Sequence, residues 1–131
     1  MTSTVASSPT LLVVGGGIAG MTAALEAAET GRDVILVERE PTLGGRTAQL
    51  YRYFPKMCHP TCGLEINLRR LRANRRVRVL TMAEVTAVAG RAGDYRVSVR
   101  QRPRYVNERC TACGACAKAV EATIPNRHNY G

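Results

Sequence analysis

Residues 10–40 read TLLVVGGGIAGMTAALEAAETGRDVILVERE, and this stretch decides the fold. The apolar run Leu11–Val14 predicts a buried strand, the alanine-rich segment from about 19 to 30 predicts a helix, and Val34–Val37 predicts a second strand. Glycines separate the first strand from the helix, and Gly31 closes the helix. A strand, a helix and a strand in this order form a βαβ unit, which is typical of a Rossmann-like α/β fold with a parallel sheet.

The glycines after the first strand have G-x-G-x-x-G spacing, and each has a mechanical reason. Gly15 suits the tight turn, Gly17 lets the backbone approach a pyrophosphate at the helix N-terminus, and Gly20 allows the helix to pack closely on the strand. Ile18 and Ala19 lie in the same turn. The sequence therefore predicts a dinucleotide-binding turn made of these five residues.

An acidic residue ends the second predicted strand. Glu38 lies 18 residues after Gly20, where a carboxylate hydrogen-bonds the hydroxyls of an adenosine ribose. Because a carboxylate repels a 2′-phosphate, we expect a non-phosphorylated adenosine, with Arg39 beside it. A glycine-rich turn without a ligand is the alternative, but the ordered strand, glycines, helix, strand and acid favour a cofactor.

A second glycine pair follows in the segment REPTLGGRTAQL, residues 39–50. Gly44, Gly45 and Arg46 resemble the second signature of the two-dinucleotide-binding-domain flavoproteins, in which it lies near the FAD diphosphate. The resemblance implies FAD rather than NAD. In that superfamily the FAD domain is completed by chain that returns after an inserted nicotinamide domain. We therefore expect residues 11–131 to be the N-terminal part of an FAD-binding domain, from a longer flavoprotein or a truncated relative.

The middle of the chain predicts further elements without evident chemistry. Leucines at helical spacing indicate a short amphipathic helix with an arginine-rich, solvated outer face. Its leucines are Leu64, Leu68 and Leu71, and its outer arginines are Arg69, Arg70 and Arg72. Residues 76–81, RVRVLT, predict a third parallel strand, expected beside the first. Residues 84–101 predict a β-hairpin about the GRAGD turn, which would return the chain toward the flavin.

Three of the five cysteines, Cys110, Cys113 and Cys116, have the spacing C-x2-C-x2-C. This matches the first three positions of the bacterial ferredoxin run, in which three thiolates bind one cubane cluster. The fourth position of that run is Val120, so one [4Fe-4S] cluster would need a remote thiolate. Cys58 and Cys62 are the candidates for this ligand. The residues beside the triplet, Ala112, Gly114 and Ala115, are small, which suits a ferredoxin-like loop around a cluster.

Other uses of the cysteines stay open. A four-cysteine zinc site also uses C-x2-C pairs, although two such spacings in one triplet favour iron-sulfur. Cys58 and Cys62 are a possible redox disulfide facing the flavin, but their C-x3-C spacing, their distance from Gly45 and the intervening Pro60 match known pairs poorly. The cysteine that does not bind metal is a buried thiol or a nucleophile, and His59 is more typical of a structural residue.

Composition narrows the function classes. The 131 residues carry a formal charge of +9, but the basic segments lack interleaved aromatic residues and any nucleic-acid-binding signature. Residues 1–10, MTSTVASSPT, predict a disordered lead and not a signal peptide. The longest apolar stretch falls short of the roughly 20 residues that span a bilayer. We therefore expect a cytoplasmic protein without nucleic-acid binding or membrane insertion, and in a reducing cytosol grouped cysteines are more often metal ligands or redox catalysts than structural disulfides.

Three segments together resemble one family. They are VVGGGIAGMTAALEAAETGRDVILVEREPTLGGR, YFPKMCHPTCGLEIN and PRYVNERCTACGAC. The chain is similar through them to the A-type subunit of the heterodisulfide reductases, in particular the shorter forms of sulfur-oxidising bacteria and of the quinone-interacting oxidoreductases of sulfate reducers. The resemblance implies a thioredoxin reductase-like FAD core with iron-sulfur ligands near the isoalloxazine. In methanogen forms a cysteine aligns with Cys62, whereas the position of Cys58 is usually acidic, which implies Cys62 as the fourth ligand.

The resulting hypothesis is an FAD- and [4Fe-4S]-containing oxidoreductase, which serves electron transfer within a heterodisulfide reductase-like complex in dissimilatory sulfur metabolism. We expect other subunits of that complex as partners and a homodimer, and we assign no catalytic residue. Two alternatives remain. One is a flavin-dependent disulfide oxidoreductase that uses Cys58 and Cys62, and the other is a zinc- or cluster-stapled binding module with a vestigial nucleotide site.

Overall fold

The computed structural model describes residues 9–125 and 127, and its centre is a parallel sheet. The strands β1 (Leu11–Val14), β2 (Val34–Val37) and β3 (Val77–Leu80) lie in the order β1-β2-β3. The register pairs Leu36 of β2 with Val13 on one side and with Val79 on the other. The first two strands have the predicted bounds, so the βαβ unit is confirmed.

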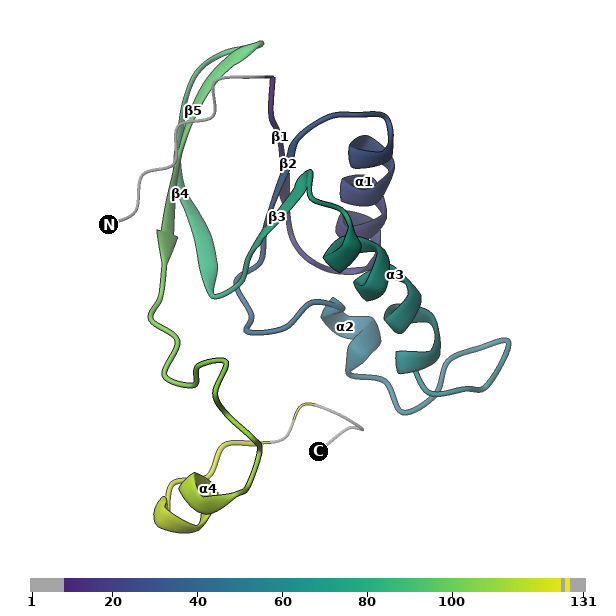
Figure 1. Ribbon diagram of the computed structural model, residues 1–131, viewed down its shortest axis with the longest axis vertical. Coiled ribbons are helices and arrows are strands. Elements are labelled where there is room, and N and C mark those ends of the chain that lie inside the picture. The colour runs from purple at the N-terminus through teal and green to yellow at the C-terminus, as the bar shows by residue number, and fades with distance from the viewer. Residues whose placement is uncertain (1–8, 126, 128–131) are drawn as a thin grey trace.

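The expected place of the third strand was wrong, because β3 pairs with β2 and not with β1. The reason lies in the two helices that connect the strands. Helix α1 (Ile18–Glu29) links β1 to β2, α3 (Thr61–Ala73) precedes β3, and both cover the same face of the sheet (Figure 1). Two right-handed crossovers on one face must step in the same direction across the sheet. The third strand therefore adds beyond β2.

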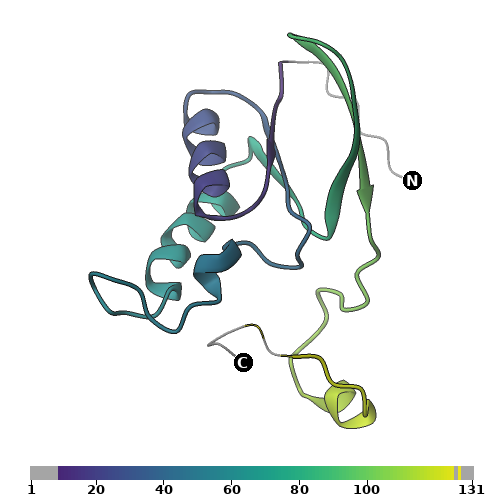
Figure 2. The same cartoon turned by 180° about the vertical axis from the view of Figure 1, so that it is seen from behind.

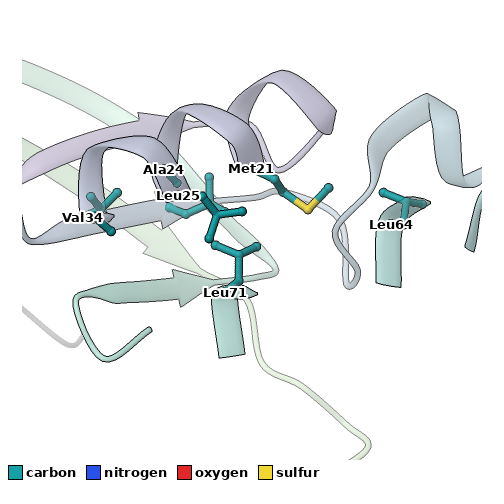
Figure 3. Packing of buried hydrophobic residues seen from close by; sticks show 8 residues of the cluster. Met21, Ala24, Leu25, Val34, Leu64 and Leu71 are labelled. Carbon is teal, nitrogen blue, oxygen red and sulfur yellow. The ribbon is translucent and has the colours of Figure 1, made fainter. Parts of the chain in front are cut away.

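The hydrophobic core lies between the helices and the sheet. Side chains from α1, β2 and α3 form one buried cluster, which includes Met21, Leu25, Leu36, Leu64 and Leu71. Figure 3 shows leucines of α3 beside side chains of α1. Because burying apolar surface contributes about 25 cal/mol per Å², this cluster stabilises the packing of α1 and α3 on the sheet.

Of the three leucines predicted for one face of α3, Leu64 and Leu71 are buried, but Leu68 is 41% exposed. The arginines on the outer face are solvated, as predicted. Arg70 nevertheless reaches across to α1, where its Nη2 lies 2.6 Å from a carboxylate oxygen of Glu29. This pair fastens the two helices at the surface, where ion pairs stabilise proteins by less than about 1 kcal/mol.

The predicted hairpin is confirmed as β4 (Ala83–Arg91) and β5 (Asp94–Gln101), with a bulge between Val85 and Ala87. Figure 2 shows the hairpin on the side of the sheet opposite the helices. Gly90 has φ +105°, and a Cβ there would lie 2.1 Å from the carbonyl oxygen of Asp94. The turn of the hairpin therefore requires glycine at this position.

The chain that leaves the hairpin returns to the end of the sheet where β2 ends. The guanidinium of Arg102 donates to the carbonyl oxygen of Arg39 at 2.8 Å, and that of Arg104 donates to the carbonyl oxygen of Pro41 at 3.1 Å. The arm then carries the cysteine triplet and the short helix α4 (Ala115–Ala119). Another short helix, α2 (Gly45–Ala48), follows the second glycine pair.

The predicted disordered lead falls on residues 1–10, of which only Pro9 and Thr10 are among the described residues. Across the described part of the chain, no helix combines the length and the apolar character needed to cross a bilayer.

Candidate dinucleotide-binding site and cysteine segments

Two glycine turns meet at the carboxyl ends of β1 and β2. The backbone N–H of Gly44 donates to the carbonyl oxygen of Gly16 at 2.8 Å, and Gly17 and Gly44 form a parallel bridge. The turn after β1 is joined to β2 as well, because the N–H of Gly15 donates to the carbonyl oxygen of Val37 at 2.8 Å. The structure thus brings the two predicted glycine motifs together at the end of a parallel sheet where nucleotides bind.

Several glycines are required by the packing of the protein itself. A Cβ on Gly20 would lie 1.8 Å from the carbonyl oxygen of Gly15, which is an impossible contact. A Cβ on Gly45 would lie 3.0 Å from the Cα of Gly17, and Gly45 itself has φ +56°. These glycines let α1 begin against β1 and let the second turn lie on the first, in agreement with the role predicted for Gly20.

Gly17 differs from its neighbours because nothing in the described chain occupies the place of its missing side chain. An added Cβ would meet no atom of the described residues within 4 Å, and φ is −73°, which any residue adopts. The fold therefore does not demand glycine at this position. The space beside Gly17 suits the close approach of a ligand to the backbone that the sequence predicts here, and the contact with a pyrophosphate stays a prediction.

The N-terminus of α1 opens at the same place. Gly17 precedes the helix without a side-chain cap, and its carbonyl oxygen accepts the N–H of Met21 at 2.9 Å as the first helical hydrogen bond. The earlier N–H groups of such a helix have no partner within the helix and carry partial positive charge. Ile18 and Ala19 are exposed at this terminus, so the residues predicted for the turn fit a diphosphate.

Glu38 is the most buried charged residue among those described, with 8% of its surface exposed. Its carboxylate accepts the N–H of Gly16 at 2.5 Å and the N–H of Glu40 at 2.8 Å. The side chain therefore ties the first glycine turn to the chain after β2. Its predicted contact with an adenosine ribose stays a prediction, as do the cofactor contacts of Arg39 and Arg46.

Sequence reasoning missed Gly16. A Cβ there would lie 2.4 Å from Cδ2 of Leu43 and 3.0 Å from a carboxylate oxygen of Glu38. Gly16 also donates to Glu38 and accepts from Gly44, so it joins all three parts of the site. The run of three consecutive glycines, one more than the motif needs at that point, was the available signal.

The segment before α3 holds Cys58 and Cys62 near a tyrosine that sequence reasoning also missed. Tyr53 and Cys58 form an antiparallel bridge, and a Cβ on Gly63 would lie 3.0 Å from Oη of Tyr53. A hydrogen bond to Cys58 and the negative charge of its thiolate raise the pKa of Tyr53, and the charge of Cys62 adds to this. Both thiols are free, Cys58 half-buried and Cys62 exposed.

The cysteine triplet lies on the exposed arm, with all three residues accessible. Hydrogen bonds from the backbone of Ala115 and from the side chain of Thr111 lower the pKa of Cys113. The sulfur of Cys110 accepts the N–H of Ala112 at 3.4 Å. Such N–H bonds to sulfur are those that iron-sulfur ligands use.

The donor set therefore suits a metal, but its geometry is not assembled. Over residues 9–125 and 127, no three His, Cys, Asp or Glu side chains are grouped closely enough to hold a metal ion. In Figure 1 the arm that carries α4 stands apart from α3, at whose start Cys62 lies. The ligand set of Cys62 (or Cys58), Cys110, Cys113 and Cys116 stays a prediction.

The fold and the joined glycine turns define a class of protein. The family described as "FAD dependent oxidoreductase" matches residues 10–101. The chain therefore belongs to the FAD-dependent oxidoreductases, and its glycine turns are part of an FAD-binding domain.

Comparison with curated relatives narrows the family further. The chain is 42% identical over 121 residues to an A-type iron-sulfur subunit of CoB–CoM heterodisulfide reductase from Methanopyrus kandleri. It is 42% identical over 124 residues to the corresponding subunit from Methanocaldococcus jannaschii and 40% identical to a similar A-type protein from Archaeoglobus profundus. Each alignment covers 92% of this chain but 18% of the relative. The resemblance to the A-type subunit of heterodisulfide reductases is thus confirmed, and the chain spans less than a fifth of those proteins.

Solved structures agree with the fold. L-proline dehydrogenase from P. horikoshii superimposes with a TM-score of 0.59 at 23% identity, over 70% of this chain and 19% of that one. Thioredoxin reductase from T. acidophilum gives a TM-score of 0.55 at 21% identity, over 70% and 31%. At such identities the likeness concerns the fold alone, and it confirms the predicted thioredoxin reductase-like α/β architecture.

Proposed function

We propose that the chain is an FAD- and [4Fe-4S]-containing electron-transfer subunit of a heterodisulfide reductase-like complex in dissimilatory sulfur metabolism. The observation that carries the proposal is the pair of interlocked glycine turns, open to a ligand at Gly17, in a chain that also bears a C-x2-C-x2-C arm. Relatives named as iron-sulfur subunits of heterodisulfide reductases align with 92% of this chain. Both cofactors in one subunit would let electrons pass between two-electron and one-electron carriers.

The residues of the first turn would hold the diphosphate of FAD. Backbone N–H groups at the start of α1 would donate to phosphate oxygens, and Gly17 leaves room for their approach. The second turn, with Gly44, Gly45 and Arg46, would close on the diphosphate or the flavin. Glu38, already bonded to Gly16 and Glu40, retains lone pairs on both oxygens for the ribose hydroxyls.

The cysteines would supply the ligands of the cluster, whose chemistry is one-electron transfer. Cys110, Cys113 and Cys116 would provide three thiolates, and Cys62 the fourth, with Cys58 as the alternative. The lowered pKa of Cys113 supports this role, because metal ligation requires the thiolate. Ligation would require the arm to move toward the start of α3.

The relatives are much longer than this chain, so its partners are part of the proposal. The relatives carry the names of enzyme subunits, which supports assembly with other subunits of an electron-transfer complex. The proposal includes a homodimer of this chain and a cytoplasmic location. Free thiols at all five cysteines are consistent with a reducing compartment.

The test is the cofactor content of the chain purified without oxygen. Visible and electron paramagnetic resonance spectra, with flavin, iron and zinc analyses, are measured for the wild type and for Cys113→Ala, Cys62→Ala and Cys58→Ala. The proposal expects FAD and a [4Fe-4S] signal in the wild type, and loss of the cluster with retained flavin in Cys113→Ala and Cys62→Ala. Cys58→Ala is the matched control and should keep both cofactors.

Other results would redirect the proposal. Cluster loss in Cys58→Ala but not in Cys62→Ala would show that Cys58, and not Cys62, is the fourth ligand. A yellow protein without iron would favour a flavin-dependent disulfide oxidoreductase using Cys58 and Cys62, for which the contact of Tyr53 with Cys58 is the supporting observation. A protein that contains zinc but no flavin would favour the third hypothesis, a zinc-stapled binding module with a vestigial nucleotide site.

A further inference from the structure

A groove runs along β3, on the helical side of the sheet. Its volume is about 700 Å³, and it lies between α3, the segment 41–43 after β2, and the chain after β3. Arg75 stands at the end where β3 begins, and Thr81 and Arg104 stand at the end where β3 finishes. The groove is separate from the glycine turns, since none of residues 15–17, 44 or 45 lines it.

The floor of the groove is apolar. It is lined by Leu43, Leu68, Leu71, Val77 and Val79. Leu68 is 41% exposed although it lies on the same helical face as the buried Leu64 and Leu71. An apolar side chain left open on the core-facing side of a helix marks surface that a further element can cover.

Arginines surround this floor, and none of the described residues that line it is an aspartate or a glutamate. Arg72 and Arg75 form no ion pair with any described residue, whereas Arg70 and Arg76 nearby are paired with Glu29 and Asp33. The third arginine, Arg104, is held in place by hydrogen bonds to Thr81 and Pro41. The groove is therefore a positively charged site with a pre-oriented cation at one end.

The backbone beside the groove is also open. Within the described part of the chain, β3 is an end strand of the sheet and pairs only with β2. From Val77 to Thr81 the strand spans about 13 Å at about 3.3 Å per residue. An extended segment can add to such an edge through main-chain hydrogen bonds, while alternate side chains enter pockets beside it.

We propose that this groove, defined by Arg72, Arg75, Arg104 and the apolar residues on α3 and β3, binds an extended acidic segment of a partner protein. Apolar side chains at alternate positions would cover Leu68, Leu71, Val77 and Val79. Acidic side chains near the two ends of the segment would pair with the arginines, and the backbone would pair with the edge of β3. The proposal concerns a surface apart from the cofactor sites and does not depend on FAD or a cluster.

The test measures fluorescence anisotropy with the full chain of a fluorescein-labelled peptide, called the glutamate–leucine peptide, that has glutamates at both ends and leucine at alternate positions between them. Two otherwise identical peptides carry lysine in place of glutamate or serine in place of leucine. We expect the glutamate–leucine peptide to bind and the other two to bind at least about tenfold more weakly, because each lacks one of the two complementary features.

Charge-reversal variants locate the binding. Arg72→Glu/Arg75→Glu should weaken binding of the glutamate–leucine peptide by about tenfold or more, because two exposed ion pairs are lost and two charge repulsions are gained. Arg91→Glu/Arg96→Glu, on the exposed hairpin, changes the net charge equally and should leave binding unchanged. Circular dichroism checks that both variants fold.

Four results would overturn the proposal. One is the absence of peptide binding to the wild type. Another is an equal loss in both double variants, which would show binding to the overall positive charge. The other two are equal binding of the serine peptide and displacement of the glutamate–leucine peptide by ADP at equimolar concentration, either of which would show a simple anion site.

Discussion

A Cβ on Gly20 would lie 1.8 Å from the carbonyl oxygen of Gly15, so α1 starts in direct contact with the turn that follows β1. The backbone atoms on both sides belong to the joined βαβ unit, and neither can retreat without displacing the helix or the strand. The substitution Gly20→Ala should therefore lower the free energy of unfolding by at least about 1–3 kcal/mol, the usual cost of overpacking. Urea denaturation of the flavin-free chain measures it, and unchanged stability would contradict this packing.

Gly17→Ala should behave in the opposite way. Its added methyl group meets no described atom within 4 Å and its φ of −73° suits alanine, so the free energy of unfolding of the flavin-free chain should hardly change. FAD affinity should fall by about tenfold or more, because the methyl group would overpack the place of the pyrophosphate. Flavin titration followed by fluorescence measures this. Equal FAD affinity of the variant and the wild type would place the diphosphate elsewhere.

Glu38→Gln tests the link between the two turns. The carboxylate accepts N–H groups from both Gly16 and Glu40, whereas an amide offers only one oxygen acceptor. One N–H at the nearly buried site would lose its partner, which costs about 1–3 kcal/mol. Denaturant unfolding of the flavin-free chain should show this loss. Glu65→Gln on the exposed face of α3 serves as the control and should stay within about 0.5 kcal/mol of the wild type.

Leu71→Ala should destabilise the chain by about 2–5 kcal/mol, because it leaves a cavity between α1 and α3. Leu68→Ala makes the same chemical change one turn earlier in α3, where the side chain is 41% exposed, and should cost well under half as much. The difference between the two midpoints in urea is the measurement. Equal losses would mean that Leu68 is covered in solution.

The thiol of Cys113 should react with iodoacetamide at lower pH than an ordinary cysteine in the metal-free chain. Hydrogen bonds from Ala115 and Thr111 lower its pKa, and the thiolate is the reactive form, so the half-maximal rate shifts toward acid. Alkylation at each site is followed by mass spectrometry across pH. Thr111→Val removes one donor and should shift the profile of Cys113 back toward higher pH, while a profile unaffected by Thr111→Val would exclude that hydrogen bond.

Local sequence was enough for the first part of the fold. The bounds of β1 and β2 and the helix between them follow from apolar runs, periodicity and glycines within about thirty residues, which are short-range signals. The hairpin was predictable for the same reason. The family resemblance was carried by residues whose order along the chain is itself informative, and the comparisons confirm it.

Only the tertiary structure decided which distant parts meet. The position of β3 beside β2 depends on both helices covering one face, and the contact of Gly16 with Gly44 joins turns that are far apart in the sequence. Glu38 was chosen from its place after a strand, but its bonds to Gly16 and Glu40 follow from the packed turns. The groove along β3, with Arg72, Arg75 and Arg104, likewise has no local signature, because its charges come from a helix, a loop and the chain beyond the hairpin. Spacing along a chain predicts local geometry, whereas contacts between segments are set by packing of the whole.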